Sequence, residues 1–221
     1  MCGRFSIMLE PADYREEMEI AEFPEDFMPR YNVAPTQPVL AILDPDRRQA
    51  EWLRWGLVPS WAKDPSIGSR MINARAETLQ EKPSFRSAFL RRRCAILADG
   101  FYEWQKPSGG KGRSQPFYIR RADRRPFAFA GLWDVWKPAE GEPLRTCTII
   151  TTGPNSLLAP IHDRMPVILD RSTLWNWLQP AEPAALQSLL RAYPPERMEV
   201  YPIGLLVNNA SLDTPEIIRP I

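Results

Sequence analysis

Apolar runs of strand length, separated by turn residues, recur along most of the chain. Between residues 94 and 152 they are rich in Phe, Tyr, Trp, Ile and Thr, which favour pleated and partly buried strands. The pattern predicts strands at residues 2–9, 39–43, 50–55, 94–98, 100–105, 116–120, 127–135, 146–152, 165–169 and 198–202.

Helical signals are fewer and shorter than the strand signals. They predict helices at residues 11–23, 74–80, 84–91, 172–178 and 181–192. In the last of these segments, Ala184, Leu186, Leu189 and Leu190 supply an apolar face. Segment 106–115 has the Gly, Ser, Pro and Lys content of a surface loop, and the stretch 56–70 is also rich in loop residues.

Many strands with a few short helices indicate an α+β protein. The sequence has no internal repeat and no linker long enough to divide it, and its 24 prolines are scattered, which favours short elements and fixed turns. We therefore expect a single domain over residues 1–221. Its expected core is a curved, mainly antiparallel β-sheet or open barrel with short peripheral helices.

The net charge of the chain does not by itself indicate binding to nucleic acid. The net charge is +1, so binding to nucleic acid would need a local basic patch rather than bulk charge. Candidate patches are the arginine runs at residues 91–93, 120–121 and 124–125. The simpler interpretation of any one run is a solvated charged surface.

Three cysteines, Cys2, Cys94 and Cys147, are widely spaced and fit neither a disulfide framework nor a metal-binding motif. A reduced, cytoplasmic environment is therefore expected, and the N-terminus lacks the pattern of a signal peptide. No apolar run approaches the roughly 18 residues that span a bilayer. With one histidine and no clustered cysteines, no metal or other cofactor is expected.

Cys2 carries unusual chemistry if Met1 is removed, because the chain would then begin with a free 1,2-aminothiol. Its amine can condense with an aldehyde to a Schiff base, and its thiol can close on the same carbon as a five-membered thiazolidine. The second step is intramolecular and therefore strongly favoured. The alternative is that Cys2 is only a small residue after the start codon.

Three further residues are candidates for proton transfer or positioning. His162 is the only histidine and precedes an apolar strand, although a lone histidine more often caps a turn. Glu103 is flanked by Phe101, Tyr102 and Trp104, so it is either a carboxylate with a raised pKa in an apolar pocket or a solvated residue on an edge strand. Asn73 precedes an apparent helix, where the simpler function is an N-cap.

Seven segments, taken in order, resemble a known protein family, the SOS response-associated peptidases (SRAP), whose members sense abasic sites in DNA. The resemblance runs from residue 2 to about residue 170. The segments are Cys2-Gly3-Arg4-Phe5, Asn32-Val33-Ala34-Pro35-Thr36-Gln37, Trp55-Gly56-Leu57-Val58-Pro59-Ser60-Trp61, Asn73-Ala74-Arg75-Ala76-Glu77-Thr78, Asp99-Gly100-Phe101-Tyr102-Glu103-Trp104, Ala130-Gly131-Leu132-Trp133 and His162-Asp163-Arg164-Met165-Pro166.

The resemblance implies a covalent mechanism. Cys2 would form a stable thiazolidine crosslink to an abasic site, and Asn73 would hold the Cys2 amine or the sugar. Glu103 would move protons during formation and reversal of the crosslink. His162 would protonate the sugar ring oxygen and so favour the open aldehyde. Removal of Met1 by the protein itself, through Glu103 and the Cys2 thiol, is also implied.

The same resemblance implies partners and a binding surface. The expected partners are single-stranded DNA that contains abasic sites and junctions between single and double strands, and the protein is expected to be a monomer that is nucleoid-associated when bound. Arg4, Arg75 and Arg164 would contact phosphates, which gives affinity without sequence preference. Trp61 and Trp104 would stack on flanking bases, and Asn32 belongs to the same set of DNA-binding candidates.

Two other functions remain open from the residues alone. An N-terminal-nucleophile amidohydrolase would also use Cys2, but it would turn over a small amide and leave no DNA adduct. A non-catalytic single-strand binding domain would bind intact and abasic DNA about equally, and Cys2 would be dispensable.

Overall fold

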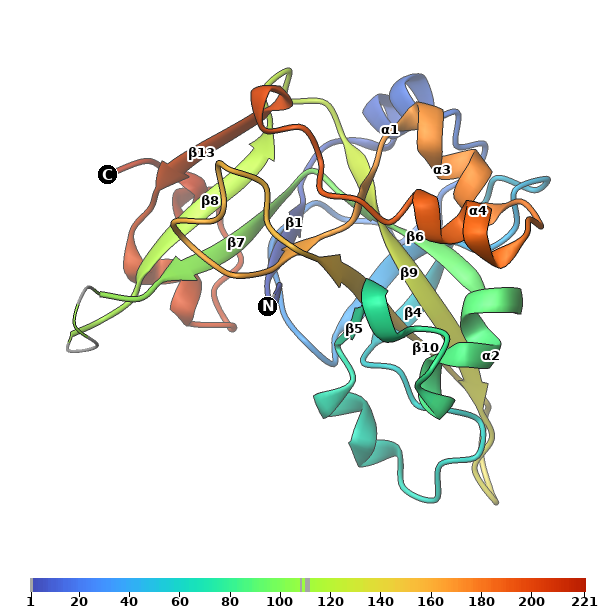
Figure 1. Cartoon of the computed structure of the whole chain (residues 1–221). Coiled ribbons are helices and arrows are strands. Elements are labelled where there is room, and N and C mark those ends of the chain that lie inside the picture. The colour runs from blue at the N-terminus through green and yellow to red at the C-terminus, as the bar shows by residue number, and fades with distance from the viewer. Residues whose placement is uncertain (1, 108, 110–111) are drawn as a thin grey trace.

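Strands in two sheets organise the molecule, for which the computed structural model describes residues 2–107, 109 and 112–221 (Figure 1). The first sheet is five-stranded and antiparallel, in the order β13-β8-β7-β1-β2. Its strands are β1 (Phe5–Ile7), β2 (Arg30–Val33), β7 (Gly100–Gln105), β8 (Gln115–Arg121) and β13 (Met198–Pro202).

The second sheet closes on itself as a barrel, because β10 pairs with both β9 and β4. Around the ring the order is β10-β4-β3-β6-β9, and all pairings except β10–β4 are antiparallel. The ring strands are β3 (Pro38–Ile42), β4 (Ala50–Trp55), β6 (Arg93–Ala98), β9 (Phe127–Trp136) and β10 (Leu144–Thr152). Short strands β5 (Asn73–Arg75) and β11 (Met165–Pro166) pair with β10, and β12 (Ile168–Leu169) pairs with β9.

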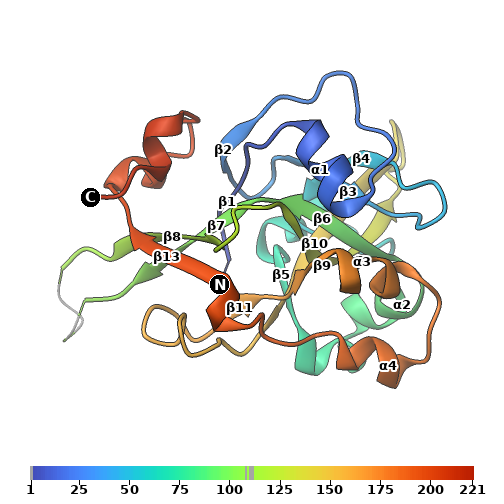
Figure 2. The same ribbon diagram turned by 90° about the horizontal axis from the view of Figure 1, so that it is seen from above.

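Short helices surround these sheets, and Figure 2 shows α2, α3 and α4 on the side of the barrel away from β8 and β13. The α-helices are α1 (Pro11–Met18), α2 (Pro83–Arg91), α3 (Arg171–Leu178) and α4 (Pro183–Ser188). Proline begins three of them, where its missing N–H costs nothing. The 3₁₀ helices are η1 (Pro65–Arg70), η2 (Ala76–Thr78), η3 (Pro195–Arg197), η4 (Leu205–Asn208) and η5 (Pro215–Ile218). The predicted α+β class with a curved, mainly antiparallel sheet is confirmed.

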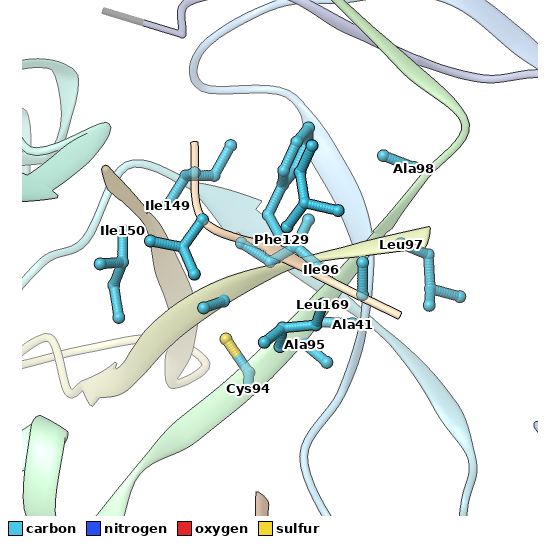
Figure 3. Close-up of a cluster of buried hydrophobic side chains, with 14 of the residues drawn as sticks. Ala41, Cys94, Ala95, Ile96, Leu97, Ala98, Phe129, Ile149, Ile150 and Leu169 are labelled. Atoms are coloured by element: carbon cyan, nitrogen blue, oxygen red, sulfur yellow. The ribbon is translucent and has the colours of Figure 1, made fainter. Parts of the chain in front are cut away.

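The main core lies in and around the barrel. Strand β6 is buried on both faces over its whole length, which explains its continuous apolar sequence. Figure 3 shows side chains of β6 gathered with Ala41 of β3, Phe129 of β9, Ile149 of β10 and Leu169 of β12. Removing so much apolar surface from water is the dominant favourable contribution to folding.

Sequence reasoning placed several elements wrongly. Residues 74–80 were expected as a helix, but Asn73–Arg75 form β5, which pairs in parallel with Ile149–Thr151, and only a 3₁₀ turn follows. Tertiary pairing overrides the local helical preference there. The predicted helix 11–23 ends at Met18, where Glu19 adopts a left-handed conformation with φ of 57°. Residues 108, 110 and 111 of the predicted loop 106–115 lie outside the described residues.

A buried network fixes β1, the strand that follows Cys2. The Asp99 carboxylate accepts hydrogen bonds from the Ser6 hydroxyl, the Tyr14 hydroxyl and the backbone N–H groups of Met8 and Leu9. Burial raises the pKa of Asp99, and these donors oppose the shift. Because each donor is satisfied by the same carboxylate, the direction in which the chain leaves β1 is well defined.

Gly100 beside this network should not tolerate a side chain. A Cβ added there would lie 2.1 Å from the Tyr118 hydroxyl, which itself hydrogen-bonds to Ser6. We expect Gly100→Ala to lower the free energy of unfolding by about 3 kcal/mol, because Tyr118 must move within a packed interior. Urea unfolding midpoints measure the change. The matched control is Gly153→Ala, whose added Cβ meets nothing within 4 Å; equal midpoint shifts in the two variants would contradict the packing argument.

Candidate active site

Cys2 lies three residues before the start of β1, next to the strand that carries Glu103. Phe5 pairs with Phe101, and the backbone N–H of Tyr102 donates to the carbonyl of Arg4 at 3.0 Å, so the N-terminal residues run antiparallel to β7. Cys2 is fully buried. Burial and the charge of Glu103 raise the pKa of its thiol, so the sulfur is protonated at neutral pH and needs a base to become a nucleophile.

Glu103 is itself buried, with 1% of its surface exposed, although it is a carboxylic acid. Burial raises its pKa from 4.5 to about 7, and the nearby charge of Asp163 acts in the same direction. A carboxyl group that exchanges its proton near neutral pH is suited to act as acid in one step and base in the next. Of the two alternatives from the sequence, the solvated residue on an edge strand is wrong, because Glu103 is buried and β7 lies between β8 and β1.

Asn73 joins this pair from the other sheet. Its Nδ2 donates to the carbonyl of Cys2 at 2.8 Å. Its Oδ1 is buried, and no hydrogen-bond partner for it is found among the described residues. The residue is in β5 rather than at a helix N-cap, so its side chain serves the N-terminal segment. The unused acceptor leaves a place for one more donor at Cys2.

His162 lies on the turn that faces the end of β7. Gln105, the last residue of β7, donates from Nε2 to the carbonyl of Pro160 at 2.9 Å, which holds this turn in place. The backbone N–H of Arg164 donates to His162 Nδ1 at 3.0 Å, so the neutral ring carries its proton on Nε2. Burial lowers the pKa of His162, which favours this neutral form.

Arg4 is half-buried, and no carboxylate of the described chain pairs with it. Its Nη1 donates to Asn32 Oδ1 and to the carbonyl of Val207, both at 2.7 Å. Asn32 is completely buried, and its Nδ2 donates to the carbonyls of Asn209 and Leu212. Its amide is thus used within the protein, and the arrangement favours a supporting function over the predicted direct contact to DNA.

Arg164 and Arg75 lie near one another at the end of β5. Arg164 binds the Glu77 carboxylate through two hydrogen bonds of 2.9 Å and donates to the carbonyl of Thr151 at 2.6 Å. This pairing lowers the pKa of Glu77, whose side chain is solvent-accessible. Arg75 is exposed. Arg75 therefore presents its charge to solvent directly, while Arg164 must share its charge with Glu77.

The two tryptophan candidates are held differently. Trp104 donates from Nε1 to Asn208 Oδ1 at 2.8 Å, which fixes its indole. Trp61 is 61% exposed and lies on the loop between β4 and η1. Gly56 and Gly68 close that loop, because a Cβ on either would lie 2.6 Å from the carbonyl oxygen of the other. A large exposed indole on a closed loop is available for stacking.

The three arginine runs that the sequence suggested as basic patches are largely engaged within the protein. Arg92 pairs with Asp134, and buried Arg93 donates to backbone carbonyls at the end of α2 and α3. In the other runs the ion pairs are Arg120–Glu199, Arg121–Glu17, Arg121–Asp123 and Arg125–Glu17. These contacts occupy the arginines within the protein, and Arg93 and Arg121 are buried rather than part of the solvated charged surface that was the simpler interpretation.

Sequence reasoning missed the contribution of the C-terminal residues. Val207, Asn208 and Asp213 contact Arg4, Trp104 and β2, yet they follow the last predicted strand and carry no recognisable motif.

Within the described ranges, no group of three or more His, Cys, Asp and Glu side chains could hold a metal ion. Nor does any helix there combine the length and apolarity needed to cross a membrane.

Comparison with known proteins relates this geometry to a family. The family model of SOS response associated peptidase (SRAP) matches residues 1–210. The chain is 49% identical to the abasic site processing protein YoqW of Bacillus subtilis (strain 168), over 99% of both chains. It is 33% identical to the abasic site processing protein HMCES of Xenopus tropicalis, over 100% of this chain and 78% of that protein.

A crystal structure of a Bacteroides thetaiotaomicron protein has the same fold, with a TM-score of 0.86, 29% identity and complete coverage of both chains. The predicted resemblance is thereby confirmed over nearly the whole length of the sequence, including the region after residue 170. This chain belongs to the SRAP family.

Proposed function

We propose that the protein recognises abasic sites in single-stranded DNA, including those at junctions with duplex, and bonds to them covalently through Cys2 once Met1 is removed. The observation that carries the proposal is the cluster that buried Cys2 and Glu103 form with half-buried Asn73. Membership of the SRAP family and the abasic-site-processing relatives YoqW and HMCES support the same substrate.

The first chemical step joins the Cys2 amine to the aldehyde carbon of the open abasic sugar. A C–N bond forms, the carbonyl oxygen takes one proton from the amine and a second from an acid, and it leaves as water to give a protonated Schiff base. Protonated Glu103 supplies a proton to the departing oxygen and becomes a carboxylate. A pKa of about 7 keeps a large fraction of Glu103 protonated at neutral pH, whereas a glutamate of ordinary pKa would be almost fully ionised.

The second step closes the ring. The Cys2 thiol gives its proton to the Glu103 carboxylate, and its sulfur bonds to the former aldehyde carbon of the protonated Schiff base. The C=N electron pair moves onto nitrogen, which keeps its proton as the ring N–H. The overall change is aldehyde plus aminothiol to thiazolidine plus water. The raised pKa of the thiol makes the nearby base necessary, and the intramolecular geometry makes closure favourable.

His162 has a separate task in this proposal. An abasic sugar is mostly a closed ring, and opening it requires a proton at the ring oxygen. The imidazolium form of His162 is the proton donor of the required kind, and its lowered pKa means that the ring returns readily to the neutral form after the transfer. Asn73 Oδ1 would accept a hydrogen bond from the Cys2 amine or from a sugar hydroxyl.

DNA is held by contacts that do not depend on its sequence. Arg4, Arg75 and Arg164 would contact phosphates, and Trp61 and Trp104 would stack on flanking bases. Inserting an abasic nucleotide costs less than extruding a normal one, because no base has to be unstacked. We assign Asn32 to the support of Arg4 rather than to DNA itself.

The aminothiol exists only after Met1 is cleaved, since Cys2 nitrogen is otherwise an amide. In cleavage by the protein itself, the Cys2 thiol would attack the Met1 carbonyl, and the Met1–Cys2 amide bond would break to give a thioester and the free Cys2 amine. Glu103 would carry the proton from sulfur to nitrogen, and water would then hydrolyse the thioester and release methionine. The same residues would thus prepare the N-terminus and then carry out the crosslinking.

Intact mass spectrometry of the purified protein tests the proposal. The protein alone should lack one methionine residue. After incubation with abasic single-stranded DNA, its mass should rise by that of the oligonucleotide less one water molecule, and the adduct should survive heating and denaturation. Equal binding of intact and abasic DNA without any adduct would instead favour a non-catalytic binding domain. Turnover of small amides without an adduct would favour an N-terminal-nucleophile amidohydrolase.

A further inference from the structure

Strand β2 contains a bulge on the outer edge of the five-stranded sheet. Between its paired positions, β2 has two residues, Tyr31 and Asn32, where β1 has only Ser6. An extra residue in one strand leaves backbone groups outside the ladder and bends the strand locally. These backbone groups need partners, because unpaired polar groups at a partly buried edge are costly.

Asp213 supplies those partners from the C-terminal arm, which we define as residues 203–221. Its Oδ1 accepts hydrogen bonds from the backbone N–H groups of Tyr31 and Asn32, the latter at 3.0 Å. Its Oδ2 pairs with Arg30 Nε at 3.0 Å. One carboxylate thus ties three consecutive residues of β2 to the arm.

The arm is packed rather than loosely attached. Ile203, Val207 and Ile217 are buried in a second apolar cluster with Tyr102 and Tyr118 of the five-stranded sheet. Figures 1 and 2 show the arm beside β7 and β8. The family match ends at residue 210, so Asp213 lies beyond the part of the chain that the family model describes.

A chain of contacts leads from Asp213 to the candidate DNA site. Asp213 fixes the backbone of Asn32, whose side chain accepts a hydrogen bond from Arg4 and donates to carbonyls of the arm. The arm carbonyl of Val207 accepts a second hydrogen bond from Arg4. The guanidinium is therefore oriented by the arm and the bulge together.

We propose that Asp213 is a positioning residue for DNA binding, which clamps the β2 bulge so that Asn32 and Val207 hold Arg4 toward a phosphate beside the lesion. The inference rests on the proposed function only in assigning Arg4 to a phosphate. Asp213 touches neither the DNA nor the reacting atoms, and its effect passes through Arg4.

Whether removal of Asp213 strengthens or weakens DNA binding distinguishes a positioning residue from a carboxylate that only repels phosphates. Removing a carboxylate near a DNA site reduces repulsion of phosphates and should strengthen binding. Loss of the clamp should weaken binding, because Arg4 would no longer be held in one orientation. Glu216→Ala is the matched control, since it removes a carboxylate from the same arm that pairs with Arg219 and not with β2.

The experiment measures the dissociation constant for single-stranded DNA that contains a tetrahydrofuran abasic analogue, which has no aldehyde and cannot be crosslinked. We expect Asp213→Ala to raise it about fivefold. The log–log salt slope should shrink by about 0.7, the share of one phosphate. Asp213→Asn keeps an acceptor oxygen and should bind with intermediate affinity, while Glu216→Ala should bind at least as tightly as the unchanged protein.

A double-mutant cycle with Arg4→Ala completes the test. If Asp213 acts through Arg4, the substitution Asp213→Ala should have no further effect on affinity or salt slope once Arg4 is absent. Additive effects, or an Asp213→Ala variant that behaves like Glu216→Ala, would overturn the inference. Because the analogue cannot react, failure of the unchanged protein to crosslink true abasic DNA would count against the proposed function and not against this positioning.

Discussion

A Cys2→Ala variant is expected to form no heat-stable adduct with abasic single-stranded DNA, a loss of at least about a thousandfold in adduct yield. The variant has no thiol, so a Schiff base formed by an N-terminal amine could not close to a ring and would hydrolyse on heating. A denaturing gel run after heating, together with intact mass, measures the outcome. Persistence of the adduct in this variant would exclude the mechanism.

Cys2→Ser is the companion variant, because it nearly preserves the size of the buried side chain and leaves a small residue after Met1. Its hydroxyl is a much weaker nucleophile than the thiol and supports only the Schiff base or a labile oxazolidine. Once intact mass shows that Cys2→Ser has lost Met1, we expect an adduct that appears after borohydride reduction and is absent without it. Urea unfolding of both variants controls for folding. A heat-stable adduct of Cys2→Ser without reduction would show that sulfur is not required.

Much of the fold could be predicted from the sequence because strands of the barrel are strongly apolar. The predicted range 50–55 matches β4, and 100–105 matches β7. The failures lie where tertiary pairing decides the structure. Strand β2 has a mixed sequence, Arg30–Val33, and is a strand only because β1 pairs with its inner edge while Asp213 satisfies its outer edge. No local pattern could reveal those partners.

The candidate site, like the fold, could be predicted from the sequence only in part. Cys2, Asn73, Glu103 and His162 were predicted from motifs that are far apart in the sequence, and the cluster of Cys2, Glu103 and Asn73 forms because β1, β5 and β7 meet at one end of the sheets. Burial of Glu103 could be suspected from its aromatic neighbours, but the size of its pKa shift depends on the closed site. The function of Asn32 could not be predicted, since its partners belong to the C-terminal arm.

A Glu103→Gln variant is expected to crosslink abasic DNA about a hundredfold more slowly, with little change in its affinity for the unreactive analogue. Glutamine has nearly the same shape and polarity as protonated glutamate, but it can neither donate nor accept a proton in the reaction. In the unchanged protein the rate should vary with pH around the Glu103 pKa of about 7, and this dependence should disappear in the variant. Rate and affinity falling together would indicate a structural function instead.

The same substitution should stabilise the protein at high pH, which distinguishes a functional carboxylate from a structural one. Because the folded pKa of Glu103 is raised from 4.5 to about 7, the folded state holds this proton more tightly than the unfolded state, and ionisation removes the resulting stability as the pH rises from 4.5 through about 7. Glutamine avoids that ionisation. The free energy of unfolding of Glu103→Gln should therefore exceed that of the unchanged protein by about 3 kcal/mol at pH 8, and the difference should vanish below pH 4.5. Urea unfolding across this range measures it. A variant that is more stable yet slower would show that the buried carboxylate is retained for its chemistry, whereas lower stability at every pH would mean that its main function is to hold the fold together.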